Sequence, residues 1–187
     1  MPPKVKITKD NVIKTALHLL RTQGETAINA RTIANALNCS TQPIFSNFPT
    51  MEELKNEIKV SAYNLYLDYL QSEATGGVFA PYKAYGMAYI RFAKEEKELF
   101  KLLFMCDRKG EETTPTKDFI SSVEMIMKNL GLSKKQAELF HFEMWTCVHG
   151  IATMFATSFC FYSWEDISKV LSDVYQGLRL KYLSKEN

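Results

Sequence analysis

Residues 28–48 constrain the fold most, because they contain two short amphipathic segments separated by only a few polar residues. Asn38 lies between the segments and tolerates the left-handed conformation that ends many helices. Ser40 or Thr41 follows and can cap the start of a second helix. The spacing, at i, i+1 and i+4 in each segment, predicts a helix-turn-helix in which each helix buries one apolar stripe: Ile33, Ala34 and Leu37, then Ile44, Phe45 and Phe48.

The second predicted helix has a polar first turn, which suits contact with DNA. Its free N–H groups and positive dipole end favour phosphates, and Gln or Asn side chains can bind adenine through two hydrogen bonds. A packed helical hairpin with a polar surface has the same periodicity, so periodicity alone leaves both interpretations open. On the DNA-binding interpretation, we expect contacts from Arg31, Thr41, Gln42, Pro43, Phe45, Ser46 and Asn47.

Several motifs follow one another between residues 11 and 58. An apolar helix ending at Gly24 precedes Asn-Ala-Arg-Thr-Ile-Ala at 29–34, and Ile-Phe-Ser-Asn-Phe at 44–48 precedes Pro-Thr-Met-Glu-Glu-Leu at 49–54. This order resembles the DNA-binding domain of the tetracycline-repressor (TetR) family of bacterial transcriptional regulators. The resemblance implies an all-α protein, with an N-terminal three-helix helix-turn-helix DNA-binding domain followed by a helical ligand-binding and dimerisation domain. We place these domains at residues 1–49 and 50–187.

Two positions depart from the family pattern. Phe45 stands where members usually carry Tyr, and Met51 where they usually carry Lys; the resemblance implies a phosphate contact at each position. Each lost phosphate contact reduces the slope of the logarithm of the binding constant against the logarithm of salt concentration by roughly one. Lys55 could supply the missing amine, and Lys4 and Lys6 could contact phosphates or the minor groove from a flexible basic arm. A solvated terminus without DNA contacts is the alternative for that arm.

Charge is shared unevenly along the chain. Residues 1–48 contain six Lys or Arg and two Asp or Glu, whereas the rest contains 17 and 19. A basic N-terminal segment followed by a slightly acidic segment fits a DNA-binding domain joined to a domain with a different function. The start is polar and does not resemble a signal peptide, so we expect a cytoplasmic protein.

The sequence shows no pattern typical of a metal site or an active site. The four cysteines are widely spaced and form no Cys-x-x-Cys pair, which argues against zinc and against disulfides. His141 and His149 lie two turns apart on a predicted helix, with Cys147 nearby, but neither a catalytic triad, paired carboxylates nor a glycine-rich phosphate loop stands out. We therefore expect no metal, no cofactor and no enzymatic activity.

Beyond Thr50 the sequence predicts only helices. Thr50 and Glu53 match a capping box that starts a long helix, and Ser133 and Ser163 are the predicted caps of the last two helices. Residues 144–164 carry no charge apart from a histidine and approach the length of a membrane span. Their many hydroxyl groups favour a long helix buried by protein instead, so we expect no membrane segment.

The last helix carries an apolar stripe that must meet another apolar surface. The stripe alone predicts burial, whereas the resemblance implies that the last two helices pair with those of a second subunit. The predicted homodimer interface contains Ile167, Val170, Leu171, Val174 and Leu178.

Aromatic and methionine side chains are dense after residue 60, and such side chains can adapt to varied apolar ligands. Each of them can equally be ordinary core. The run at 145–150 also resembles a Trp-x-x-x-His-Gly signature of some family members. The candidate ligand contacts are Tyr63, Tyr66, Tyr89, Phe92, Phe104, Met105, Trp145 and His149.

Together these features predict a ligand-responsive transcriptional regulator. In this hypothesis a homodimeric repressor binds a near-palindromic double-stranded DNA operator and leaves it when a small apolar or aromatic ligand binds. The alternative is a DNA-bound adaptor whose helical part docks a protein partner and senses no small molecule.

Overall fold

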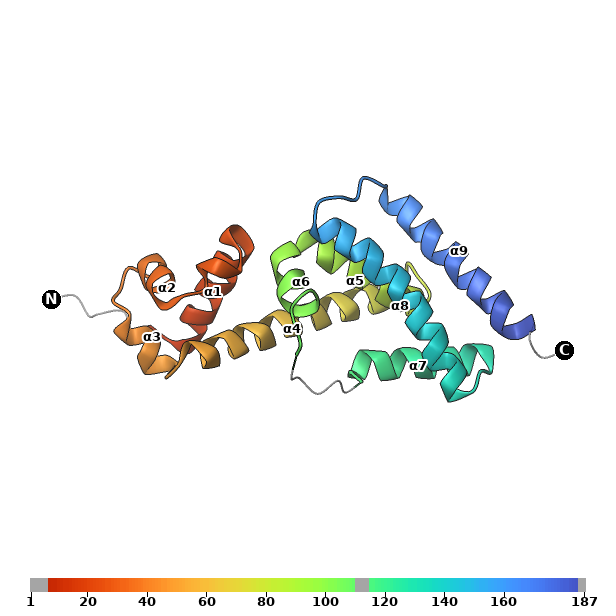
Figure 1. Ribbon diagram of the computed structural model, residues 1–187, viewed down its shortest axis with the longest axis horizontal. Helices are drawn as coiled ribbons and strands as arrows, with labels where there is room; N and C mark the ends of the chain where they lie inside the picture. The colour runs from red at the N-terminus through yellow and green to blue at the C-terminus, as the bar shows by residue number, and fades with distance from the viewer. Residues whose placement is uncertain (1–6, 110–114, 185–187) are drawn as a thin grey trace. The chain divides into compact units, whose positions relative to one another are not determined.

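The computed structural model describes residues 7–109 and 115–184, and every regular element in these residues is a helix (Figure 1). The predicted all-α fold class is therefore confirmed. Lys4 and Lys6 lie outside the described residues. In chain order the elements are α1 (Lys9–Gln23), the short 3-10 helix η1 (Glu25–Ala27), α2 (Ala30–Ala36), α3 (Gln42–Asn47), α4 (Met51–Thr75), α5 (Pro81–Glu95), α6 (Lys97–Phe104), α7 (Lys117–Leu130), α8 (Lys134–Ala156) and α9 (Trp164–Leu183).

Contacts divide the chain into two compact units. The head unit contains Met1–Leu67 and Glu96–Cys106, and the body unit contains Asp68–Glu95 and Asp107–Asn187. Helix α4 therefore contributes to both units, and α6 belongs to the head unit although it follows α5 in sequence. These units are defined by contacts, so the functional boundary at residues 49 and 50 stays a prediction.

The head unit gathers α1, α2 and α3 around the start of α4 (Figure 1). Asn38 ends α2 with a φ of 52°, as its place between the amphipathic segments predicts. Thr41 occupies the N-cap position of α3, but its backbone is helical and its side chain makes no capping bond, so the predicted side-chain cap is absent. The buried apolar residues come from all four helices: Val12, Ala16, Leu20, Ile33, Ala34, Ile44, Phe48, Leu54 and Ile58.

In the body unit, α5 packs along α8, which also contacts α7 and α9. The predicted caps are present: Ser133 and Ser163 each form a capping box at the start of α8 and α9. A buried cluster joins α7, α8 and α9 through Val123, Ile126, Leu132, Ala137, Phe140, Met144 and Tyr182.

The uncharged stretch 144–164 is not one helix. Helix α8 ends at Ala156, and Ser158 then adopts a left-handed φ of 59° before α9 begins at Trp164. The amides of Phe159 and Cys160 both donate to the Met154 carbonyl, which turns the chain back over the end of α8. Among the described helices, none is long and apolar enough to cross a membrane.

Candidate functional site

Helix α3 is held by its apolar face, and its polar face is exposed. Ile44 and Phe48 are fully buried against the head core. The opposite face carries four exposed side chains within two turns, and we call this set the α3 row: Thr41, Gln42, Phe45 and Ser46. Four of the residues predicted to contact DNA thus lie together, and Arg31 is exposed on the preceding helix.

Phe45 does not belong to the buried stripe of α3. Its side chain is 44% exposed, whereas Ile44 and Phe48 on either side are buried. This exposure corrects the prediction that Phe45 packs inward, and it leaves Phe45 in the α3 row.

Asn47 and Pro43, the remaining predicted contacts on α3, are half-buried. The Asn47 Nδ2 group donates to the Pro43 carbonyl oxygen at 2.8 Å and to the Ile7 carbonyl oxygen at 3.1 Å. Both side-chain N–H donors of Asn47 therefore already have partners within the protein.

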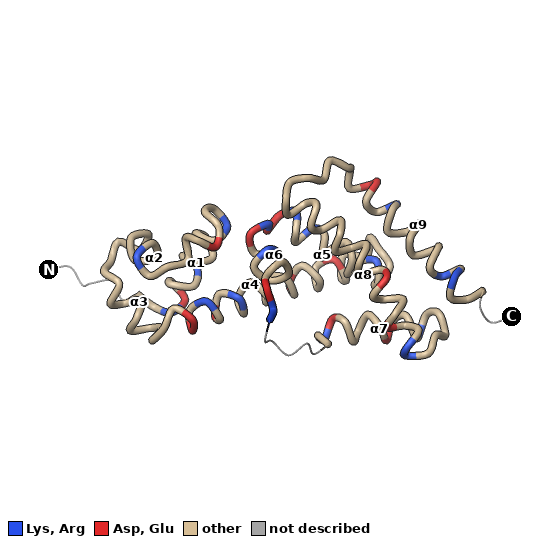
Figure 2. Tube along the Cα trace, in the orientation of Figure 1, with Lys and Arg blue, Asp and Glu red and all other residues tan. Residues whose placement is uncertain are grey.

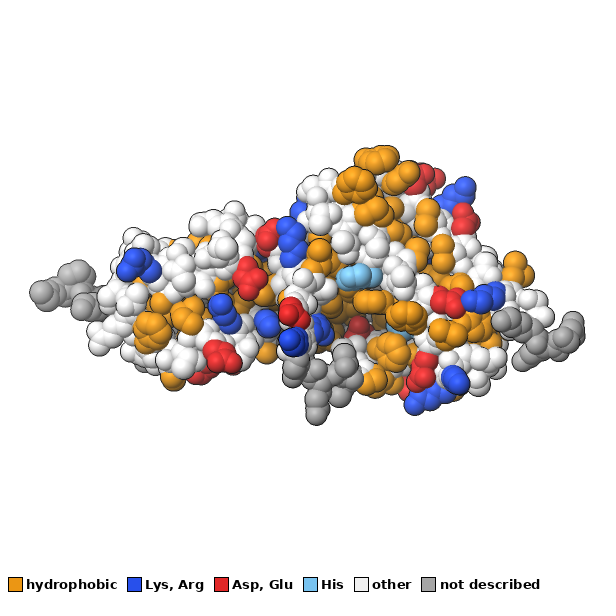
Figure 3. All heavy atoms as spheres, in the orientation of Figure 1, with side chains coloured by type: hydrophobic (Ala, Val, Ile, Leu, Met, Phe, Trp, Pro, Cys, Tyr) orange, Lys and Arg blue, Asp and Glu red, His pale blue; other side chains and the backbone are white. Residues whose placement is uncertain are grey.

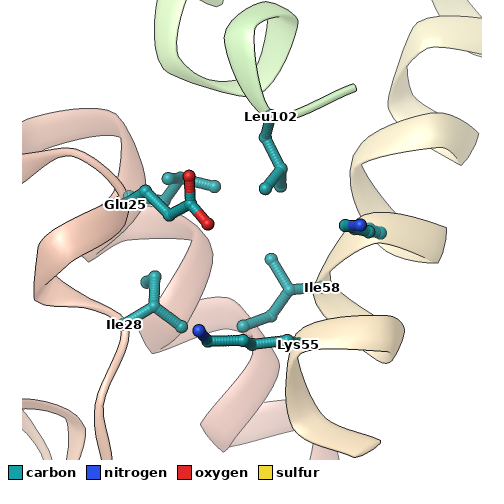
Figure 4. Close-up of a pocket in the computed structure, with 7 residues that line it drawn as sticks. Glu25, Ile28, Lys55, Ile58 and Leu102 are labelled. Atoms are coloured by element: carbon teal, nitrogen blue, oxygen red, sulfur yellow. The ribbon is translucent and has the colours of Figure 1, made fainter. Parts of the chain in front are cut away.

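Basic residues lie on α1, α2 and the first part of α4 in the head unit (Figure 2). The structure places Lys55 on α4, beside a pocket of about 30 Å³, rather than in the α3 row. Figure 4 shows Glu25, Ile28, Ile58 and Leu102 around the same pocket. A volume of this size suits a water molecule and is far below the roughly 300 Å³ of an ordinary ligand pocket.

The predicted ligand contacts divide between the two units. Tyr66 contacts Tyr63 and Phe104 in the head unit, with ring centroids 5.7 and 5.2 Å away, and Met105 is exposed there. The other four residues belong to the body unit. Phe92 is fully buried there and lies edge-on to Tyr69, so it leaves no surface for a ligand and is a core residue.

Two tyrosine–histidine pairs connect α5 to α8 in the body unit. The Tyr82 hydroxyl lies 2.9 Å from His141 Nδ1, and the Tyr89 hydroxyl lies 2.9 Å from His149 Nδ1. Trp145 stacks on the His149 ring with centroids 4.7 Å apart and an interplanar angle of 16°. The structure therefore brings together three of the predicted ligand contacts, namely Tyr89, Trp145 and His149.

Burial keeps both pairs uncharged near neutral pH. It raises the pKa of the Tyr82 and Tyr89 hydroxyls, lowers the pKa of His141 to about 4, and lowers the pKa of His149. The Asp118 carboxylate acts in addition on both pairs, since it raises the pKa of Tyr89 and opposes the lowering for His141. Sequence reasoning missed the Tyr82–His141 pair and Asp118, because their spacing along the chain carries no signal of contact.

Most of the predicted dimer stripe faces the subunit's own core. Ile167 and Leu171 are buried, and Val174 and Leu178 pack against the α7–α8–α9 cluster. Of the five residues, only Val170 has an exposed side chain. A stripe at helical spacing shows that one helix face is buried, but it does not show which surface buries it.

A different apolar set is exposed on α8 and α9, and we call it the outer face. Figure 3 shows hydrophobic side chains gathered over the body unit on the side in view. Nothing lies within 4 Å of a Cβ built on Gly150 or Gly177, so the backbone of both helices is accessible at these points. The exposed apolar residues of the outer face are Leu139, Phe142, Trp145, Val170 and Leu180.

Comparison with known proteins agrees with these observations. Residues 82–166 match the model of the tetracyclin repressor-like C-terminal domain family. No curated protein matches the chain. The fold is similar to a TetR-like transcriptional regulator from Rhodococcus sp. RHA1, with a TM-score of 0.60, 13% identity and 98% of each chain covered.

It is also similar to a TetR variant from Acinetobacter baumannii AYE crystallised with minocycline, with a TM-score of 0.57, 15% identity, and 97% of this chain and 99% of that chain covered. The family match covers α5 to the start of α9, whereas the motifs of residues 11–58 lie in the head, so two separate parts of the chain lead to one assignment. Residues 82–166 therefore match a tetracyclin repressor-like C-terminal domain, and the chain has the fold of these TetR-like proteins.

Proposed function

We propose that this protein is a transcriptional regulator of the TetR family, a cytoplasmic, homodimeric repressor that binds a near-palindromic operator and leaves it when a small, largely apolar ligand binds. The observation that carries the DNA-binding part is the α3 row, a set of exposed side chains on a helix whose opposite face is buried. In this proposal α3 enters the major groove, where Gln42 in its first turn contacts base edges and Arg31 contacts phosphate or guanine.

The outer face supports the homodimer. Exposed apolar side chains on two adjacent helices favour burial against a second copy, and the open glycines allow close approach of backbones. A two-fold dimer would place two copies of α3 roughly 34 to 36 Å apart, the spacing of successive major grooves.

The Tyr89–His149–Trp145 group supports a ligand site in the body. Aromatic rings provide apolar contact area, and a hydrogen-bonded hydroxyl and imidazole can orient a polar substituent. Helix α4 has residues in both units, so a ligand that binds better to one arrangement of α4 would change operator affinity. The change is about tenfold for each 1.4 kcal/mol of differential affinity.

Duplex selection from a random library tests the DNA-binding part. We expect wild-type protein to enrich a near-palindromic sequence and to lose affinity steeply as salt rises. Failure to bind any duplex at low ionic strength would overturn the proposal. A solvatochromic naphthalene dye tests the ligand site: its fluorescence should rise on binding, and the Trp145→Ala variant should bind it more weakly.

One observation favours the second candidate, a DNA-bound adaptor. The connection between α8 and α9 exposes three aromatic side chains, and a large apolar surface patch is typical of a protein-docking site. The side chains are Phe159, Phe161 and Tyr162, with exposed fractions of 71%, 81% and 56%. The triple variant Phe159→Ser/Phe161→Ser/Tyr162→Ser separates this aromatic loop from the ligand site. If it binds the dye as well as the wild-type protein does, the loop is not the ligand site, and protein docking on the loop can be tested separately.

A further inference from the structure

Two polar side chains of α3 already donate their hydrogen bonds within the protein. The Ser46 hydroxyl donates to the Gln42 carbonyl oxygen at 2.9 Å. The Asn47 Nδ2 group donates to the carbonyl oxygens of Ile7 and Pro43. A bidentate contact to adenine needs an amide N–H as well as an amide oxygen, so Asn47 cannot make one in this arrangement. Base contact by α3 therefore depends on Gln42 and on the other exposed side chains of the helix.

Phe45 lies on the same exposed face as Gln42, three residues further along α3. Residues three apart are neighbours on a helix surface, with Cβ atoms about 5–6 Å from each other. The buried side of α3 is occupied by Ile44 and Phe48, and the Phe45 ring is 44% exposed. Covering this ring with an apolar group would therefore be favourable, because it removes apolar surface from water.

The chemistry of the ring limits what it can contact on DNA. The phenylalanine side chain has no hydroxyl, so Phe45 cannot donate a hydrogen bond to a phosphate. Among the groups that bases present in the major groove, the C5 methyl of thymine is the apolar one, and Phe is a side chain that contacts it.

We propose that Phe45 is a specificity-determining residue that contacts a thymine methyl group within about two base pairs of the base that Gln42 contacts. The distance follows from the spacing of the two side chains, since successive bases are about 3.4 Å apart along each strand. This inference rests on the proposed DNA-binding function. It adds a requirement on the operator, namely a thymine at one defined position in each half-site.

Uracil scanning of the selected duplex tests the proposal, because uracil differs from thymine only in lacking the C5 methyl group. We expect one replacement in a half-site to weaken wild-type binding about fourfold, the value for one buried methyl group. The Phe45→Ala variant should bind the thymine duplex more weakly and should bind the uracil duplex no worse than the thymine duplex. Val60→Ala, at an exposed apolar residue on α4 within the head unit, is the matched control and should keep the preference for thymine.

The scan of the wild-type protein does not depend on how a variant folds. If no uracil replacement weakens binding, the Phe45 inference is overturned and the proposed DNA-binding function stands. A fourfold thymine preference that persists in Phe45→Ala would also overturn the inference, since another side chain would then contact the methyl group. Failure of the wild-type protein to bind any duplex would overturn both the inference and the proposed function.

Discussion

Arg21 and Glu96 form a two-point ion pair, with Nε to Oε2 at 2.7 Å and Nη2 to Oε1 at 3.0 Å. The pair joins the last turn of α1 to the residue that precedes α6, within the head unit. It adds to the packing of α1 against α6, which belongs to the head unit although it follows α5 in sequence.

Removing this pair should destabilise the protein measurably. Arg21→Ala should lower the free energy of unfolding by about 1 kcal/mol, because the pair is bidentate and Glu96 is mostly buried. Lys14→Ala is the matched control, since the Lys14–Asp10 pair is largely exposed and should contribute less. Urea unfolding measures both variants, and equal losses would contradict the expectation.

Gln42→Ala should reduce specific binding far more than nonspecific binding. Loss of a bidentate base contact costs about 1–3 kcal/mol for the selected duplex, and a phosphate contact elsewhere is unaffected. Fluorescence anisotropy with the selected and a scrambled duplex measures the difference. Gln136→Ala serves as a control, because Gln136 caps α8 in the body unit. Equal losses on both duplexes would remove Gln42 from base contact.

The buried His141 should make stability fall in mild acid. Its pKa in the folded state is lowered to about 4, against 6.5 in the unfolded chain, so below pH 6.5 the unfolded state takes up a proton that the folded state does not. The neutral His141 therefore contributes to the free energy of unfolding fully above pH 6.5. This contribution is lost progressively towards pH 4, by up to about 3 kcal/mol.

Urea unfolding between pH 7 and 4.5 measures this effect. His141→Asn removes the titrating group, so its free energy of unfolding should fall less steeply over that interval than that of the wild type. Tyr82→Phe keeps the histidine and should retain the slope, since burial is the main cause of the lowered pKa. The same slope in His141→Asn as in the wild type would contradict the expectation.

Phe142→Asp should convert the proposed dimer to a monomer. Phe142 is 57% exposed on the outer face, and burying a carboxylate in an apolar interface costs several kcal/mol. Ile120→Asp, on α7, changes an equally apolar exposed residue away from the outer face and should leave the dimer intact. Analytical ultracentrifugation distinguishes the two, and a dimeric Phe142→Asp protein would exclude this face.

Helix ends were the most predictable feature, because the signals are local. Ser133 and Ser163 cap the helices that follow them, Asn38 ends α2, and the Thr50 hydroxyl accepts a bond from the Glu53 amide at 3.1 Å. The break at Ser158 was missed, because neither Gly nor Pro marks it. It depends on backbone bonds to the end of α8, which form only when the chain has turned.

The sequence by itself determined the all-α class, the helix-turn-helix and which helix faces are apolar, since capping and periodicity act within a few residues of one another. Only the tertiary structure decided which apolar surface covers each stripe. Ile167 and Leu171 turn inward, and Phe142 and Leu180 remain outside. It also brought Tyr89 to His149 and Ile7 to Asn47, because such contacts join residues far apart in the chain and follow from packing rather than from any local preference.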